Sequence, residues 1–221
     1  MKKQFVVIGV GRFGASLAKT LSEMGQEVLA IDLKEEKVAD ISRYVTHAVQ
    51  LDATDEDSLL DFGIRNFDVG VVAIDDIQAS VLVALLLIEQ GIPYVAVKAA
   101  NELHAKLLYK LGVNEVVFPE RDMGIRMAST LVSSNILDMI ELSEDYSIVE
   151  VKAADQWIGR TLAELEFRNK YGVTVIAING VDKKTNVNPG PNEILKEGDI
   201  IVAVGETAKL NRLERELQKN K

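Results

Sequence analysis

The sequence contains no cysteine, only two histidines and four prolines, and no long apolar run. Without cysteine there can be no disulfide, thiolate metal site or cysteine nucleophile. The two histidines leave few groups that exchange protons near neutral pH. The longest apolar run covers residues 81–88, far short of the about 20 residues that span a bilayer. No signal-peptide core follows the N-terminus, so we expect a cytoplasmic protein without direct membrane insertion.

What is present is the composition of an acidic globular protein. The 221 residues include 25 Lys and Arg against 34 Asp and Glu, for a net charge of -9, and 48% of them are hydrophobic. A negative surface repels phosphate backbones, so nucleic acid is not an expected partner. The length corresponds to about one and a half average domains.

Apolar, β-branched runs alternate with segments of helical periodicity through the first half of the chain. The expected strands cover residues 5–8, 28–31, 47–51, 68–74, 92–97 and 115–118. This alternation predicts an α/β fold, a Rossmann-like doubly wound parallel sheet. A further amphipathic helix is expected at 121–134 as a crossover helix, followed by an apolar connection at 136–142.

The pattern changes near residue 142. We therefore expect an N-terminal domain over 1–142, including the crossover helix, and a small C-terminal α+β domain over 143–221. Strands are expected at 147–151, 173–178 and 200–204, with a turn-rich loop at 179–192 and a final helix at 208–219. Thr161 and Glu164 have capping-box spacing and predict a short helix.

The motif that carries chemistry is Gly9-Val10-Gly11-Arg12-Phe13-Gly14, between the first strand and the first helix. In a dinucleotide-binding turn of this type, Gly9 permits the tight turn, Gly11 lets backbone approach a pyrophosphate and Gly14 lets helix and strand pack closely. Asp32 ends the next strand, where it can accept both ribose hydroxyls and repel a 2′-phosphate. The alternative is a tight turn that binds no ligand.

Other polar residues end strands on the same edge of the sheet. Arg12 can reach a terminal phosphate or simply be an exposed arginine at a helix start. Lys98 is a second phosphate contact or a solvated strand end. Glu120 can hold a divalent cation or satisfy the amides of a helix N-terminus. The segments expected to frame adenine and ribose are Asp52-Ala53-Thr54 and Ile74-Asp75.

The sequence offers no positive sign of catalysis. His47 and His104 lack an obvious carboxylate partner in the sequence, and no hydrolase or metalloprotease motif is present. We therefore expect a nucleotide sensor and not an enzyme. One alternative is a small NAD-dependent oxidoreductase whose substrate site forms at a dimer interface. Another is a nucleotide-binding adaptor for a soluble partner.

Several segments closely resemble the regulators of potassium conductance, and more narrowly the cytosolic regulatory subunits of Ktr-type bacterial potassium uptake systems. They are residues 5–14, 77–80, 97–99 and 118–123, together with 168–172 and 189–191 in the C-terminal domain. The resemblance covers nearly the whole chain. It implies a nucleotide-binding domain joined to a C-terminal regulatory domain.

The resemblance implies binding of ATP, ADP and often NAD(H), with ATP favouring the active and ADP the inactive state. It implies dimers in an octameric ring beneath a membrane-embedded potassium-translocating subunit, and hence a peripheral position at the inner face of the cell membrane. Glu120 would help to bind a divalent cation at the dimer interface. The nucleotide-site residues so implied are Gly9, Gly11, Arg12, Phe13, Gly14, Asp32, Lys34, Asp52, Ala53, Thr54, Ile74, Ser80, Lys98 and Glu120.

Some members of the family also bind cyclic di-AMP in the C-terminal domain, across a twofold axis that suits a symmetric ligand. Here Arg168 matches the phosphate contact, Pro189 and Pro191 would lie near the base, and Thr174 stands where an Asn can make contact. In the first domain, Asp75-Asp76 replace a Gly-x-Asn segment that is one residue longer, and Lys34 replaces a frequent Asn.

Overall fold

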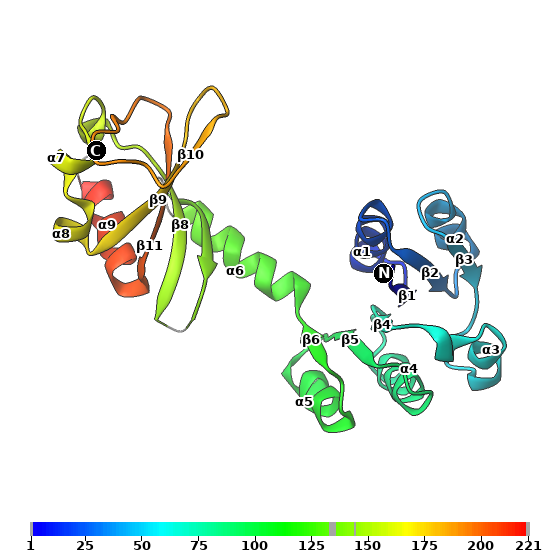
Figure 1. Ribbon diagram of the computed structural model, residues 1–221. Coiled ribbons are helices and arrows are strands. Elements are labelled where there is room, and N and C mark those ends of the chain that lie inside the picture. The colour runs from blue at the N-terminus through cyan, green and yellow to red at the C-terminus, as the bar shows by residue number, and fades with distance from the viewer. Residues whose placement is uncertain (1, 133–135, 144, 220–221) are drawn as a thin grey trace. The chain divides into compact units, whose positions relative to one another are not determined.

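The computed structural model describes residues 2–132, 136–143 and 145–219 (Figure 1). The chain divides into two compact units, Met1–Arg121 and Asp122–Lys221. They are called the first and the second unit below, and each is described by itself.

The first unit is built on a parallel sheet with strand order β3-β2-β1-β4-β5-β6. This is the doubly wound order in which the direction of strand addition reverses between β1 and β4. The strands are β1 (Gln4–Ile8), β2 (Glu27–Asp32), β3 (His47–Gln50), β4 (Val69–Val72), β5 (Tyr94–Lys98) and β6 (Glu115–Val117). The predicted Rossmann-like fold is confirmed.

Helices cover both faces of this sheet. They are α1 (Arg12–Glu23), α2 (Glu35–Ser42), α3 (Glu56–Asp61), the 3-10 turn η1 (Ile64–Asn66), α4 (Ile77–Glu89) and α5 (Glu102–Leu111). Figure 1 shows α1 and α2 on one side and α3, α4 and α5 on the other.

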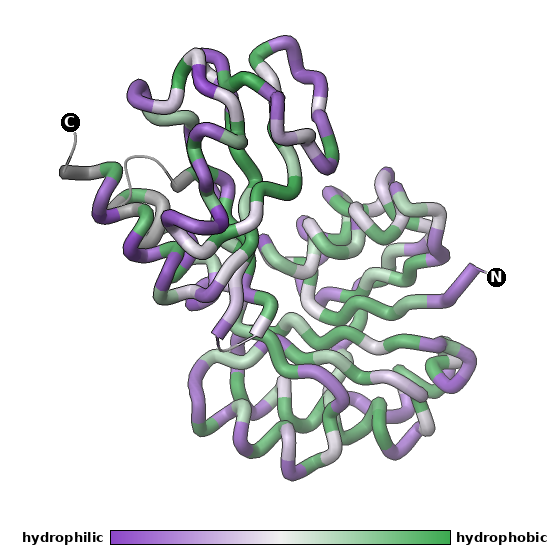
Figure 2. The backbone as a smooth tube through the Cα atoms, turned by 60° about the vertical axis from the view of Figure 1, so that its left-hand side comes forward, coloured by the Kyte–Doolittle hydropathy of each residue, from purple (hydrophilic) through white to green (hydrophobic). Residues whose placement is uncertain are grey.

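Alternation along the strands explains this arrangement. Val7 packs with Ala18 of α1, whereas Val6 and Ile8 pack with the core under α4 and α5. Because both faces are covered, the central strands β1, β2 and β4 are largely apolar and buried. Figure 2 shows hydrophobic stretches of the tube in this unit.

Side-chain caps fix where two of the helices begin. The Asp76 carboxylate accepts a hydrogen bond from the Ala79 amide and opens α4, and Asn101 does the same for α5. Gly112 ends α5 in the left-handed conformation, with a φ of 91°. These are the cap residues that satisfy free backbone groups at helix ends.

The second unit contains an antiparallel sheet with strand order β10-β9-β11-β8-β7. Its strands are β7 (Ile136–Glu141), β8 (Tyr146–Lys152), β9 (Val173–Asn179), β10 (Thr185–Val187) and β11 (Ile200–Glu206). The helical elements are α6 (Pro119–Val132), which begins in the first unit, η2 (Asp155–Trp157), α7 (Leu162–Leu165), α8 (Phe167–Tyr171) and α9 (Thr207–Lys219).

Aromatic packing organises the core of the second unit. The Trp157 and Phe167 rings meet edge to face with centroids 4.9 Å apart, and Tyr171 lies 5.8 Å from Phe167. Leu210 and Leu213 of α9 are buried in the same cluster. This core is separate from the apolar clusters of the first unit.

Three details differ from the sequence analysis. Residues 136–141, expected as a connection, form β7, because they pair antiparallel with β8, with one irregularity between Ile136 and Asp138. This strand lies in the second compact unit, which begins at Asp122, whereas the sequence analysis places the start of the C-terminal domain at 143. The short elements α8 and β10 were not expected. The last two residues of the crossover helix expected at 121–134 lie outside the described residues.

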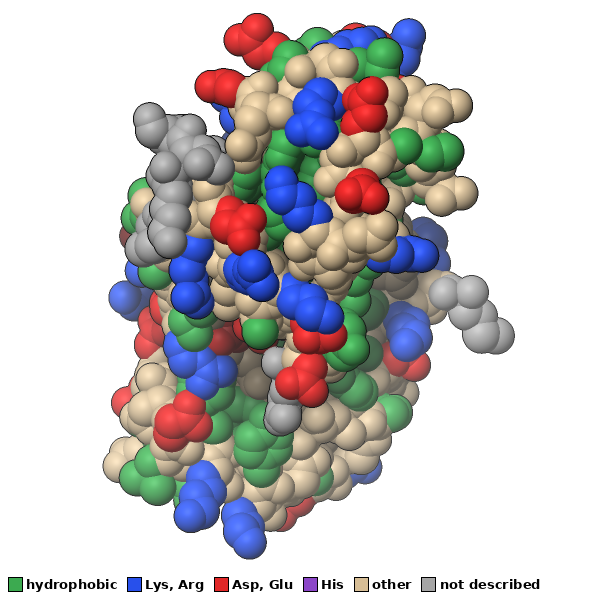
Figure 3. Space-filling view, turned by 90° about the vertical axis from the view of Figure 1, so that its left-hand side faces the viewer, with side chains coloured by type: hydrophobic (Ala, Val, Ile, Leu, Met, Phe, Trp, Pro, Cys, Tyr) green, Lys and Arg blue, Asp and Glu red, His purple; other side chains and the backbone are tan. Residues whose placement is uncertain are grey.

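In the part of the chain that the structure describes, no helix is long and apolar enough to cross a bilayer. On the face shown in Figure 3, Lys and Arg side chains are interspersed with Asp and Glu side chains.

Candidate functional site

The glycine loop between β1 and α1 is held by close backbone contacts. A Cβ at Gly14 would lie 1.9 Å from the Gly9 carbonyl oxygen, and one at Gly9 would lie 2.8 Å from the Ala73 backbone. Gly9 also has a φ of 93°, a region that favours glycine. A Cβ at Gly11, in contrast, would meet no atom within 4 Å. Gly9 and Gly14 therefore allow the backbone segments to pack closely, and Gly11 leaves space above the loop.

Asp32, at the end of β2, supports the loop from the neighbouring strand. Its buried carboxylate accepts hydrogen bonds from the Val10 amide at 2.8 Å and the Lys34 amide at 3.0 Å. Lys37 of α2 lies 3.3 Å from the same carboxylate. Each carboxylate oxygen has more than one lone pair, so Asp32 can accept further hydrogen bonds from a ligand.

A cavity of about 400 Å³ opens above the glycine loop, at the carboxyl edge of the sheet. We call it the glycine-loop cavity. Its size is in the range of small-molecule sites in proteins. Of the residues expected to bind nucleotide, those that line it are Gly9, Gly11, Asp32, Lys34, Asp52, Ala53, Thr54 and Ile74.

A second cavity of about 300 Å³, the Lys98 cavity, lies between the ends of β4, β5 and β6. Lys98 and Glu120 line it, and Ile74 and Asp75 line both cavities. The Lys98 ammonium lies 2.8 Å from the Glu120 carboxylate and 2.9 Å from that of Asp75. Sequence analysis placed Asp75 at this edge but did not predict its ion pair with Lys98.

These contacts shift the ionisation of the three groups. The hydrogen bond from Lys98 lowers the pKa of both Asp75 and Glu120. Burial alone would lower the pKa of Lys98, but its bonds to Glu120 and Asp75 outweigh this and raise it. All three groups are therefore charged at neutral pH, with two negative charges and one positive.

The remaining expected residues lie outside these two cavities. Arg12 and Phe13 are in the first turn of α1, and Gly14 is buried beneath the loop. Ser80 is fully buried in α4, and its hydroxyl has no hydrogen-bond partner among the described residues.

Two interactions at the site were missed by sequence analysis. Lys37 lines the glycine-loop cavity and pairs with Asp32, and helical spacing from the end of β2 would have indicated it. The Asp52 carboxylate accepts hydrogen bonds from the Thr54 hydroxyl at 2.6 Å and the Thr54 amide at 3.0 Å. Both bonds, the hydroxyl first, lower the pKa of Asp52.

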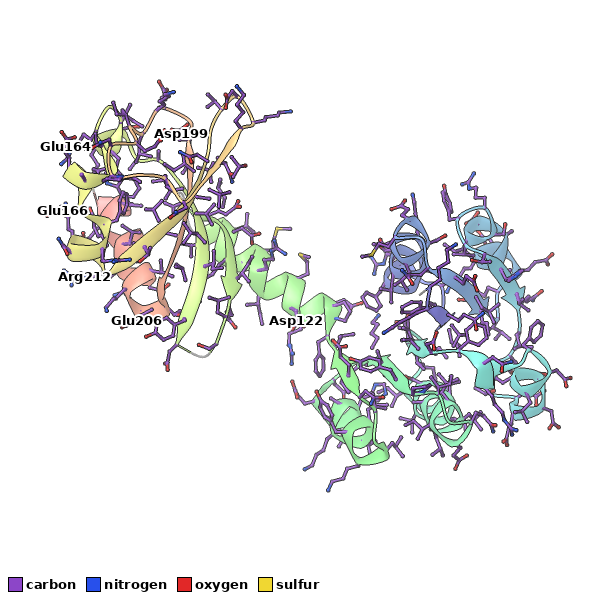
Figure 4. All side chains as sticks on the ribbon, viewed as in Figure 1. Asp122, Glu164, Glu166, Asp199, Glu206 and Arg212 are labelled. Carbon is purple, nitrogen blue, oxygen red and sulfur yellow. The ribbon has the colours of Figure 1, made fainter. Side chains whose placement is uncertain are left out.

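The second unit has a cavity of its own, of about 480 Å³, which we call the C-terminal cavity. Arg168, Thr174, Pro189 and Pro191, the residues expected at a cyclic di-AMP site, all line it. Arg168 donates to the Thr174 hydroxyl at 3.4 Å. Glu166, labelled in Figure 4, also lines the cavity and joins α7 to α8.

Among the described residues, no three His, Asp or Glu side chains are grouped so as to hold a metal ion. Asp75 and Glu120 are instead bridged by the Lys98 ammonium. A cation at Glu120 would thus need further oxygen ligands from a bound molecule or another chain.

The sheet order and the glycine loop define a protein with a Rossmann-type domain and an appended α+β unit. The TrkA-N domain matches residues 5–119 and the TrkA-C domain matches residues 146–218. The chain belongs to the regulator of potassium conductance family, in its Ktr branch, as the sequence resemblance predicted.

Full-length relatives support this assignment. The chain is 45% identical over 216 residues to Ktr system potassium uptake protein C of Bacillus subtilis, covering 97% of both chains. It is 46% identical over 215 residues to Ktr system potassium uptake protein A of the same organism, covering 97% of this chain and 96% of the relative.

A solved structure confirms the fold. The GsuK channel bound to NAD superposes with a TM-score of 0.55 and 22% identity. The alignment covers 99% of this chain and 39% of the channel chain. The likeness extends over both units, and it concerns the fold alone.

Proposed function

We propose that this chain is the nucleotide-sensing regulatory subunit of a Ktr-type potassium transporter. The observation that carries the proposal is the glycine-loop cavity, with open backbone at Gly11 and the buried Asp32 carboxylate at its side. Relatives that match the whole chain are named potassium uptake proteins, which supports a regulatory and not a catalytic role.

The chemistry of the cavity fits an adenine nucleotide. Backbone amides at the start of α1 suit phosphate oxygens, because free N–H groups and the helix dipole both favour negative charge there. Asp32 would accept the ribose hydroxyls and repel a 2′-phosphate. Asp52 and Thr54 lie at the next strand end, where a ribose or adenine would complete the site. ATP, ADP and NAD(H) all meet these requirements.

We infer that Arg12 distinguishes the nucleotides. It stands at the first position of α1, directly after Gly11, and its guanidinium can hold a terminal phosphate through two parallel hydrogen bonds. Lys98 would hold phosphate oxygens from the opposite strand ends. Glu120 would contribute one ligand to a divalent cation whose other ligands are phosphate oxygens. ATP would thereby favour the active state and ADP the inactive state.

A second copy of the chain is the partner that α6 fits best. Its apolar side chains Met123, Ile125, Met127 and Leu131 are all more than half exposed. Such a stripe of apolar surface is usually covered in a working assembly. We propose that copies pair through this helix and assemble into an octameric ring at the cytoplasmic face of the membrane, beneath the potassium-translocating subunit.

Cyclic di-AMP is the ligand proposed for the C-terminal cavity, where it would inhibit transport. Arg168 supplies the positive charge that its phosphates need, and Pro189 and Pro191 supply an apolar wall for a base. Thr174 stands where some members of the family have Asn. A hydrogen bond to the ligand at this position would therefore come from a hydroxyl group and not from an amide.

Calorimetric titration of the nucleotide-free protein tests the main proposal. ATP, ADP and NADH are titrated with and without Mg²⁺ into the wild type and Arg12→Ala. We expect the wild type to bind ATP more tightly with Mg²⁺, and Arg12→Ala to lose most of its preference for ATP over ADP. Unchanged preference in the variant would refute the role of Arg12.

Two further results would argue against the proposed regulatory function. Tight NADH binding with negligible ATP binding, together with NADH consumption on a small carbonyl compound, would favour the NAD-dependent oxidoreductase. Failure of the protein to bind a detergent-solubilised potassium-transporter subunit at any nucleotide concentration would contradict the regulatory role.

A further inference from the structure

Among the described residues, Asp75 is the one acidic residue that lines both the glycine-loop cavity and the Lys98 cavity. The neighbouring Asp76 caps α4 and so fixes the turn in which Asp75 lies. The Asp75 side chain is 88% exposed, whereas that of its partner Lys98 is 14% exposed. A solvated carboxylate is thus paired with a cation that is largely enclosed.

The positive charges around Asp75 are the ones that a phosphate chain would use. Lys98 donates to Asp75 at 2.9 Å, and this bond is the largest cause of the lowered pKa of Asp75. The charges of Lys37 and Arg12 act on the carboxylate in the same direction. Asp75 therefore occupies the electrostatic position that a bound phosphate would otherwise take.

We propose that Asp75 is a specificity-determining residue that penalises nucleotides according to the negative charge of their phosphate chain, so that ATP binds well only with a divalent cation. This inference rests on the proposed nucleotide site. A phosphate can bind Lys98 only by displacing the Asp75 carboxylate from it. The displaced carboxylate then lies near the phosphate chain that Lys98 holds, so the cost rises with the phosphate charge. A cation bound to the phosphates reduces that charge and relieves the penalty.

The expected effect is moderate. Ion pairs with one exposed partner contribute little to stability, and we expect about a fivefold change in affinity from the loss of the Asp75 charge. ADP carries less charge than ATP and should show a smaller change.

The test is calorimetric titration of the full-length wild type, Asp75→Asn and Asp76→Asn with ATP and ADP, in EDTA and in Mg²⁺. Asp76→Asn removes the same charge one residue away and keeps a cap acceptor for α4. We expect Asp75→Asn to raise the ATP affinity about fivefold in EDTA and the ADP affinity by less, so that the ATP-to-ADP affinity ratio rises. This gain should shrink in Mg²⁺. Asp76→Asn should leave the ratio close to that of the wild type.

A double-mutant cycle shows whether Asp75 acts through Lys98. In a Lys98→Met background, Asp75→Asn should change the ATP-to-ADP ratio by much less than it does in the wild type. A fully retained effect would remove Lys98 from the explanation and overturn the proposal.

The outcomes separate this inference from the proposed function. An equal ratio in the wild type and Asp75→Asn, with both binding nucleotide, overturns the inference alone. An equal gain in Asp76→Asn also overturns it, because a general field effect would then explain the result. Absence of ATP, ADP and NADH binding in the wild type would refute the proposed function and with it the inference.

Discussion

The glycine-loop cavity and the C-terminal cavity are built in different ways. The first lies at the edge of a parallel sheet, and its residues follow successive strand ends in chain order. The second is lined by the short helices α7 and α8, by β9 and by the segment that contains Pro189 and Pro191. Its residues are brought together by packing around Trp157 and Phe167 and not by strand order.

Because of this difference, the shapes of the two cavities depend on different parts of the structure. The shape of the glycine-loop cavity depends on backbone positions, since Gly9, Gly14 and the Asp32 bonds fix the loop itself. The shape of the C-terminal cavity depends on large side chains in its floor. A backbone change should therefore damage the first site, and a side-chain truncation should damage the second.

The largest effect is expected for Gly14→Ala. The new Cβ would overlap the Gly9 carbonyl at 1.9 Å, and neither backbone segment can move without breaking the β1–α1 packing. We expect a loss of about 4 kcal/mol of unfolding free energy in the first unit. Trp157, the single tryptophan of the sequence, lies in the second core, so its fluorescence should persist while circular dichroism reports unfolding of the first unit.

Gly11→Ala is the matched control within the same loop. Its Cβ meets no protein atom within 4 Å, so the melting temperature should stay close to that of the wild type. Nucleotide affinity should fall, because the methyl group occupies the space above the loop. If Gly14→Ala abolished the Trp157 signal as well, the two cores would not be independent and the comparison would fail.

Phe167→Ala should have the next largest effect, in the second unit. Phe167 is buried against Trp157 and Tyr171 and also lines the C-terminal cavity. We expect a loss of about 3 kcal/mol, measured by denaturation followed by Trp157 fluorescence. ATP binding to the first unit should be unchanged, and a parallel loss of ATP affinity would show that the two sites are coupled. Phe167→Leu, which keeps most of the volume, should lose less.

Thr161→Ala tests the short helix α7, two residues of which line the C-terminal cavity. The Thr161 hydroxyl accepts from the Glu164 amide at 3.2 Å, and the Glu164 carboxylate accepts from the Thr161 amide at 2.9 Å. Loss of this capping box should cost about 1 kcal/mol, and Thr161→Ser should restore the stability. The measurement is chemical denaturation, and an unchanged midpoint for Thr161→Ala would show that α7 does not need its cap.

The first unit could be predicted well from sequence because its strands are buried on both faces. Runs such as Val6-Val7-Ile8 are continuous and end at glycine or aspartate, so both the strands and their carboxyl ends are visible in the sequence. The ion pairs of Lys98 were not predictable, because Asp75 and Glu120 come from two other segments that only the folded sheet brings together.

The second unit was harder to predict because its elements depend on tertiary contacts. Phe167–Tyr171 is only one turn of helix, entered through Glu166 at a φ of 47°, and no propensity in the sequence favours that conformation. Ile136–Glu141 contains two acidic residues and becomes a strand only through pairing with β8. The capping box at Thr161 is a local signal, and it was confirmed.

The smallest expected effect is a pH dependence of the stability of the first unit, which contains both histidines of the sequence. His104 of α5 is almost fully buried, its Nδ1 accepts a hydrogen bond from the Ala100 amide at 3.2 Å, and burial lowers its pKa. Below the unfolded pKa of about 6.5, the unfolded chain binds a proton at His104 that the folded chain does not. The stability of the first unit should therefore fall as pH drops from 7.5 to 5.5.

His104→Asn should flatten this dependence. His47→Asn removes the other histidine, at an exposed position, and serves as the matched control. Urea denaturation followed by circular dichroism at both pH values measures it, and an equal pH dependence in the wild type and His104→Asn would contradict the assignment.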